Sequence, residues 1–204
     1  DRDARFDRVK ELAVAALARM PGGEVTTQLL AVLADPRAPD KLKDDVVALL
    51  VQRKDPDSLP VLVKQLDVHD DYIAGTEPEA LGPVAKAIAG LAGKKLDPAT
   101  VPGALAALRS HLDAPSTATP DLVLVIAAMA AIGGGAERAA LSSHLLMYHA
   151  DDDVGGDAAW DKAIVRALHD RAGPAEHELL RAVAADPRTR PGLVSAINDA
   201  LASD

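Results

Sequence analysis

Two acidic segments contain the residues that come closest to a metal-binding pattern. The first surrounds His69 and the second follows His149; their carboxylates are Asp67, Asp70, Asp71, Asp151, Asp152, Asp153 and Asp157. The alternating carboxylates that begin at Asp151 are similar to a calcium loop. The twelfth position, however, is Lys162, where an EF-hand has a bidentate glutamate. We therefore expect solvated loops with helix-capping aspartates and no metal, with docking of a basic partner segment as the alternative.

His111 and His144 occupy equivalent positions in a repeated motif. The segment from Leu108 to Leu112 returns almost letter for letter from Leu141 to Leu145. One helical repeat would separate the two histidines by about 8–10 Å between helix axes. Zinc ligands lie about 2.1 Å from the metal, so they are much closer to one another. We therefore expect no metal shared between them.

The residue patterns for catalysis and for phosphate binding are incomplete. Ser142 and Ser143 adjoin His144 in sequence, but adjacent residues on a helix do not face each other as a catalytic triad requires. The glycines at 133–135 follow an apolar helix and lack the strand and lysine of a phosphate loop, which indicates a hairpin turn. The absence of cysteine excludes disulfides and thiolate metal sites. We expect a protein that is not an enzyme and needs no cofactor.

The composition favours a helical protein that stays in solution. Of the 204 residues, 49% are hydrophobic but only 2% are aromatic, which is typical of closely packed helices rich in alanine, leucine and valine. The longest apolar run, 122–132, is shorter than the ~20 residues that span a bilayer. The net charge of −9 argues against nucleic-acid binding. The chain starts at Asp1 without a signal-peptide pattern, so we expect a fragment of a longer protein, cytoplasmic or exported.

Apolar residues at three- and four-residue spacing, interrupted by proline and glycine turns, predict five helix pairs and a closing helix. The second helices of the pairs are predicted at 25–33, 59–66, 101–112, 139–148 and 175–185. They align on Leu29, Leu62, Leu108, Leu141 and Leu179, with steps of 33, 46, 33 and 38 residues. The long step contains a loop at 67–78, which is where insertions occur in stacked repeats. Self-similarity at this period is typical of a solenoid.

The clearest repeat is the segment from Leu42 to Leu66. It has Lys43 near its start, an Asp55-Pro56 turn, and an apolar pattern formed by Val46, Ala48, Leu49, Leu59, Leu62 and Leu66. This segment resembles the HEAT-repeat family, in particular the bacterial HEAT-like class with phycobilisome-lyase-type repeats. That family often has arginine where Lys43 stands, and Gly82 occupies the corresponding place in the third repeat. We therefore expect stacking to rest mainly on apolar burial, without a continuous Asp–Arg ladder.

The resemblance covers the whole chain and implies one domain, 1–204. This domain would be an all-α, right-handed α-solenoid of about five HEAT-like hairpins with a C-terminal helix. The approximate repeats are 3–35, 39–67, 78–113, 120–149 and 157–186, with the closing helix at 190–203. The family usually holds a partner protein on an extended surface. The implied function is a non-catalytic interaction scaffold; the alternatives are a structural spacer or accessory domain of a larger protein, and a HEAT-like lyase or enzyme subunit.

In such a stack the second helices would line the concave face. When these helices are aligned, two neighbouring positions hold mostly polar residues. The residues predicted to bind a partner there are Lys64, Gln65, Arg109, His111, His144 and Arg181. The second candidate surface is the acidic loop edge, represented by Asp70, Asp71, Asp151, Asp152 and Asp153. Alternatively, these polar positions are simply the solvated side of amphipathic helices.

Enzymes with similar helical repeats need residues that are scarce in this chain. Helical-repeat di-iron hydroxylases use several His-Glu pairs, whereas only His177-Glu178 occurs here. HEAT-like DNA glycosylases need a basic groove with aromatic side chains. The single tryptophan, Trp160, lies four residues before the apolar Ile164. We predict that Trp160 packs in the core or at a repeat edge.

Overall fold

The computed structural model describes residues 2–17, 19–20, 22–35, 37–67, 81–114, 117–151, 159–170 and 173–203. Regular secondary structure in these ranges is entirely helical, as the composition predicts. The elements are α1 (Arg2–Leu17), α2 (Gly23–Ala34), α3 (Asp40–Arg53), η1 (Pro56–Ser58), α4 (Leu59–Asp67), α5 (Leu81–Ala89), α6 (Val101–Asp113), α7 (Thr119–Ile132), α8 (Gly135–Tyr148), α9 (Ala159–His169), α10 (Pro174–Ala185) and α11 (Pro191–Leu201). None of the described helices is long and apolar enough to cross a membrane.

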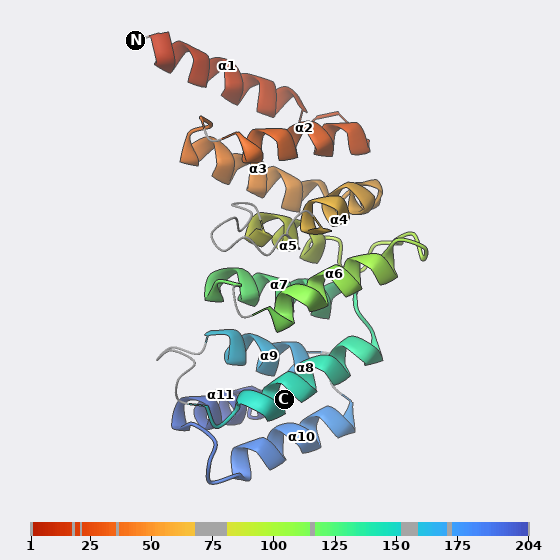
Figure 1. Ribbon diagram of the computed structural model, residues 1–204, viewed down its shortest axis with the longest axis vertical. Helices are drawn as coiled ribbons and strands as arrows, with labels where there is room; N and C mark the ends of the chain where they lie inside the picture. The colour runs from red at the N-terminus through yellow and green to blue at the C-terminus, as the bar shows by residue number, and fades with distance from the viewer. Residues whose placement is uncertain are drawn as a thin grey trace.

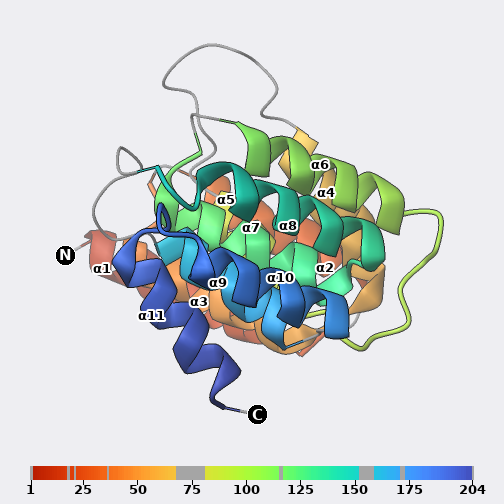
Figure 2. The same cartoon turned by 90° about the horizontal axis from the view of Figure 1, so that it is seen from below.

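The helices form two layers along the longest axis of the molecule (Figures 1 and 2). The first layer consists of α1, α3, α5, α7, α9 and α11, and each of these helices contacts the next one in this order. The second layer consists of α2, α4, α6, α8 and α10. Helices that follow one another in the chain alternate between the layers, so the apolar core lies between them. The closest packing within a layer joins α5 to α7.

The repeating leucine is the main anchor of the second layer. The side chains of Leu29, Leu62, Leu108 and Leu141 are fully buried, as their shared period predicts. In α10 the fully buried leucine is Leu180, whereas Leu179 is only half-buried. The alignment on Leu179 is therefore wrong by one residue, and the last step of the period is longer by one.

Capping glutamates explain this register. Glu137 is the third residue of α8, and its side chain accepts a hydrogen bond from the backbone N–H before the helix; Glu176 does the same in α10. These bonds fix the first turn of each helix because they satisfy a backbone donor that has no partner within the helix. Leu141 and Leu180 both lie four residues after their glutamate. The similarity between residues 29–37 and 179–188 does not include this capping bond, so it does not give the register of α10.

Gly82 and Asp121 explain the close packing of α5 and α7. The backbone N–H of Gly82, near the start of α5, donates to the carboxylate of Asp121 in the first turn of α7. A Cβ atom at Gly82 would overlap that carboxylate, so the hydrogen bond in its present geometry requires glycine at this position. Burial raises the pKa of Asp121, and the hydrogen bond from Gly82 opposes this effect. Glycine at position 82 thus has a packing reason.

Two ion pairs connect successive helices of the second layer. Arg109 Nη2 of α6 lies 3.1 Å from Glu137 Oε1 of α8. Arg138 Nε of α8 lies 3.0 Å from Glu176 Oε1 of α10. Each glutamate therefore caps its own helix and also binds the helix before it in the layer. Apolar burial is thus supplemented by Arg–Glu contacts between helices. We expected no continuous Asp–Arg ladder from the sequence, and these Arg–Glu pairs were not predicted.

Candidate partner-binding surface

The residues predicted to form one polar surface have different environments. Lys64 and Arg181 are exposed, whereas the side chain of Gln65 lies outside the described part. Arg109 is bound to Glu137, and its side chain remains 43% exposed. The second layer therefore presents some of the predicted polar side chains, but Arg109 also has a structural contact.

His111 connects two helices of the second layer. Its half-buried ring donates from Nε2 to the backbone carbonyl of Leu66, 3.1 Å away in the last turn of α4. Carbonyls in the last turn of a helix have no partner within that helix, so this bond satisfies one of them. In the described part of the chain, no three histidine, aspartate or glutamate side chains are grouped so as to hold a metal.

His144 belongs to an aromatic cluster where α8 meets α9. Its ring centroid lies 4.7 Å from that of Tyr148 and 5.0 Å from that of Trp160, and the rings of His144 and Trp160 are nearly perpendicular. Trp160 is only 3% exposed, which confirms the prediction that it packs in the core. Burial lowers the pKa of His144, while the nearby Asp113 of α6 opposes the shift. The half-buried His144 thus contributes to packing between the layers.

Most of the predicted acidic loop edge cannot be placed. Asp70, Asp71, Asp152 and Asp153 lie outside the described residues, as do His69 and Asp157. Asp151 is described and half-buried, and its backbone N–H donates to the carbonyl oxygen of Tyr148 at the end of α8, 3.1 Å away. This edge remains a prediction from the sequence.

Two large apolar side chains on α8, which are not among the residues predicted from the sequence, are exposed. Leu146 is 51% exposed and Met147 is 69% exposed. Both lie in the second layer, whose helices follow one another in Figure 1. A sequence signal exists: residues 145–148 are all apolar, and four consecutive residues cannot all face the core of a helix with 3.6 residues per turn. Leu145 takes the core position and leaves the next two outside.

A buried polar network holds the end of α8. The hydroxyl of Thr189 donates to the carbonyl oxygen of Val183, 2.6 Å away, so His149 Nδ1 must be the donor in its 2.9 Å contact with that hydroxyl. The backbone carbonyl of His149 accepts from the N–H of Arg190 at 3.1 Å. Arg190 also pairs with the fully buried Asp161 of α9. The helix that carries Leu146 and Met147 is therefore anchored at its C-terminus.

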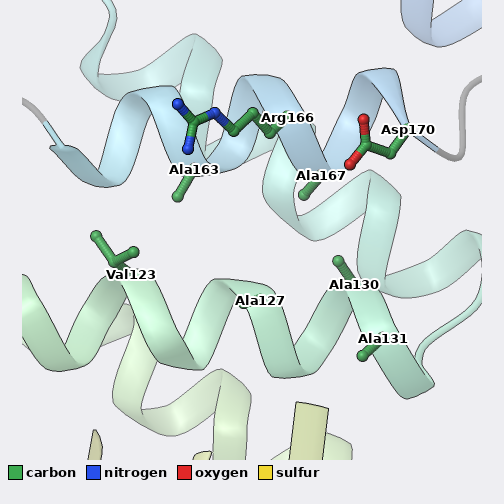
Figure 3. A pocket seen from close by; sticks show the side chains of 8 residues that line it. All are labelled: Val123, Ala127, Ala130, Ala131, Ala163, Arg166, Ala167 and Asp170. Atoms are coloured by element: carbon green, nitrogen blue, oxygen red, sulfur yellow. The ribbon is translucent and has the colours of Figure 1, made fainter. Parts of the chain in front are cut away.

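A shallow groove lies between α7 and α9, in the first layer. Its volume is about 350 Å³, and its lining consists of Val123, Ala127, Ala130, Ala131, Ala163, Arg166, Ala167 and Asp170. Figure 3 shows side chains of α7 pointing toward Ala163 and Ala167 of α9. Arg166 and Asp170 are exposed. Ligand sites usually combine an apolar lining with several converging polar groups. The lining here is mainly methyl groups, so the groove offers little to orient a small molecule.

Comparisons with family models, with curated proteins and with solved structures gave no match to this chain. The function must therefore be argued from the arrangement of the helices and from the side chains that they expose.

Proposed function

We propose that the chain is a right-handed α-solenoid of HEAT-like hairpins with a non-catalytic function. It holds a partner protein on the second layer, and neither nucleic acid nor a cofactor takes part. The proposal is supported by contacts that join each helix of the first layer to the next, and by the buried leucine shared by the second-layer helices. Stacked repeats bury apolar surface against their neighbours in this way. The net charge of −9 also disfavours phosphate binding.

The observation that carries the binding function is the exposure of Leu146 and Met147 in the layer that also exposes Lys64 and Arg181. Neighbouring exposed apolar side chains within a polar surface are typical of an interaction site. Methionine adapts its shape to a partner because its side chain is unbranched and polarisable. Leu146 and Met147 would supply apolar contacts, and the exposed polar residues would surround them.

Photo-crosslinking tests this function. Benzoylphenylalanine would replace Met147 in one variant and Gln52, an exposed residue of α3 in the first layer, in a matched control. In cells that express the protein, we expect one partner protein to crosslink at position 147 and not at position 52. Excess unlabelled protein should compete for that partner. A competitor with Leu146→Asp and Met147→Asp should not compete, although its melting temperature is preserved. Equal crosslinking at both positions, or equal competition by both competitors, would contradict the proposal.

A second candidate function is the structural one, an accessory domain that packs against a neighbouring domain. It is favoured by Val9 and Leu12 of α1, which are 62% and 57% exposed at the end of the stack. Benzoylphenylalanine at position 12 distinguishes the two functions. Crosslinking at position 12 without crosslinking at position 147 would support the accessory role and remove the scaffold role.

A further inference from the structure

The three methionines of the chain differ in their access to solvent. Met147 of α8 is 69% exposed, and Met20, which follows α1, is 54% exposed. Met129 of α7 is fully buried. Peroxides oxidise a thioether to the sulfoxide most readily where they can reach the sulfur. The side chain of Met147 is therefore the most accessible of the three to oxidation.

The neighbours of Met147 on its face of α8 are small. A long side chain on a helix lies over the preceding turn, so Met147 extends over Ser143. Ser143 is exposed, and its hydroxyl donates to the carbonyl oxygen of Ala139, 2.9 Å away. Ala150, in the turn that follows α8, is also exposed. Neither Ser143 nor Ala150 has a side chain large enough to cover the sulfur.

Oxidation of Met147 would leave the core of the protein unchanged. The core position in this turn of α8 belongs to Leu145, which is fully buried. The end of the helix is anchored by His149, whose Nδ1 lies 2.9 Å from the hydroxyl of Thr189. Because Met147 points away from these contacts, an oxygen atom on its sulfur stays in water. On Met129 the same oxygen would have to fit into a close-packed interior.

The same oxygen atom changes the chemistry of the exposed face. Leu146 and Met147 are the two large apolar side chains that we propose a partner covers. A sulfoxide has nearly the size of the thioether, but its oxygen is polar and accepts hydrogen bonds. Burying that oxygen under a partner that offers no donor is unfavourable. Oxidation would therefore weaken binding while the fold is preserved.

We infer that Met147 is a reversible oxidation site that regulates partner binding on α8. Hydrogen peroxide is the oxidant. A lone pair of the sulfur attacks one peroxide oxygen, the O–O bond breaks, and the proton on the transferred oxygen passes to the leaving oxygen, which departs as water. The sulfur is oxidised to the sulfoxide and the peroxide is reduced. This inference rests on the proposed scaffold function and adds its regulation.

Hydrogen peroxide added to the folded chain tests the site itself. Peptide mass spectrometry would follow the addition of one oxygen atom to each methionine over time. We expect Met147 to be oxidised while Met129 remains intact, with Met20 as the exposed comparison. In urea the two exposed residues should lose their advantage over Met129, because the core is then open. Equal rates for Met147 and Met129 in the folded chain would overturn the inference.

Photo-crosslinking with benzoylphenylalanine at position 150 tests the regulation, because it leaves Met147 in place. The protein also carries Met20→Leu, so that Met147 is its one exposed methionine. It would be oxidised, freed of peroxide, added to a cell extract and irradiated. We expect oxidation to lower crosslinking to the partner by about tenfold, as loss of a central apolar contact does. Sulfoxide reductases for both epimers should restore it.

Met147→Leu in the same background is the matched control. Leucine cannot form a sulfoxide, so crosslinking by this variant should be the same before and after peroxide treatment. The comparison is made within each variant, and it therefore does not depend on how well leucine replaces methionine in binding. The melting temperature of the Met147 protein should also be the same before and after oxidation.

The outcomes separate the inference from the proposed function. If the untreated protein crosslinks to no partner, the scaffold function fails and the inference fails with it. If crosslinking is equal before and after complete oxidation of Met147, the scaffold function stands and the regulation is wrong. A loss of crosslinking that also occurs in Met147→Leu, or that accompanies a lower melting temperature, would mean damage elsewhere in the chain and would overturn the inference.

Discussion

The two layers of the molecule differ in how many of their side chains are buried. In the first layer, α5 and α9 bury most of their side chains, including Ile88, Ile164 and Leu168. In the second layer, α8 and α10 bury fewer positions, among them Leu141, Leu145 and Leu180, and leave most of their other side chains at least partly exposed. The first layer is thus covered on several sides by other helices. The second layer has one side exposed to solvent.

The contacts within the layers differ in the same sense. Gly82 and Asp121 allow α5 and α7 to approach closely, whereas α6 and α8 are connected by the partly exposed pair Arg109–Glu137. Apolar burial stabilises by about 25 cal/mol per Å², while an exposed ion pair contributes about 0–1 kcal/mol. The first layer thus contributes more to the stability of the stack, and the second layer can vary its surface at little cost to folding.

The largest expected effect compares core truncations in the two layers. Ile126→Ala in α7 should lower the free energy of unfolding by about 4 kcal/mol, because a fully buried side chain leaves a cavity that its neighbours cannot fill. Leu145→Ala in α8 should cost about 2–3 kcal/mol, because a helix with one solvated side can shift inward. Urea denaturation measures both values. A larger loss for Leu145→Ala would mean that the second layer, and not the first, contributes more to the stability of the protein.

Gly82→Ala tests the close approach of α5 and α7. The added methyl group would overlap the carboxylate of Asp121, so this side chain must turn away and lose its hydrogen bond to Gly82, or the two helices must move apart. Overpacking of this kind costs about 1–3 kcal/mol. Gly103→Ala is the matched control, because a Cβ atom at that position in α6 meets no other atom. If both variants unfold at the same urea concentration, the contact between α5 and α7 has no special role.

The ion pair between Arg109 and Glu137 should have a smaller effect on stability. A double-mutant cycle with Arg109→Ala and Glu137→Ala should give a coupling energy of about 1 kcal/mol or less, because Arg109 remains in contact with water. Glu137→Ala alone should cost more than Arg109→Ala, since it also removes the helix cap. A coupling energy well above 1 kcal/mol would show that this layer, too, depends on specific contacts for its stability.

Sequence periodicity predicted the helices and the buried leucines because a core position selects residue type strongly. It failed at Leu179, where the register depends on the capping bond of Glu176. The candidate surface was harder to predict. His111 and His144 have polar side chains, but their actual contacts, a carbonyl of α4 and the ring of Trp160, come from residues distant in sequence. Leu146 and Met147 could have been found, because a run of apolar residues on a helix must place some of them outside.

The smallest expected effect concerns the contact between α8 and α9 and depends on pH. Burial lowers the pKa of His144 in the folded chain below its ordinary value of 6.5, so the unfolded chain takes up a proton first. The stability that neutral His144 contributes is therefore complete above pH 6.5. It falls as the pH decreases from there through the lower pKa of the folded state.

His144→Phe keeps an aromatic ring against Tyr148 and Trp160 but cannot titrate. The free energy of unfolding in urea can be measured by the fluorescence of Trp160. We expect it to fall more between pH 7.5 and 5.5 in the original chain than in this variant. Other titrating groups act in both proteins and cancel in the difference. An equal loss in both would mean that the ring of His144 is accessible enough to water to be protonated without cost. In that case it would belong to the exposed polar surface that the sequence first predicted.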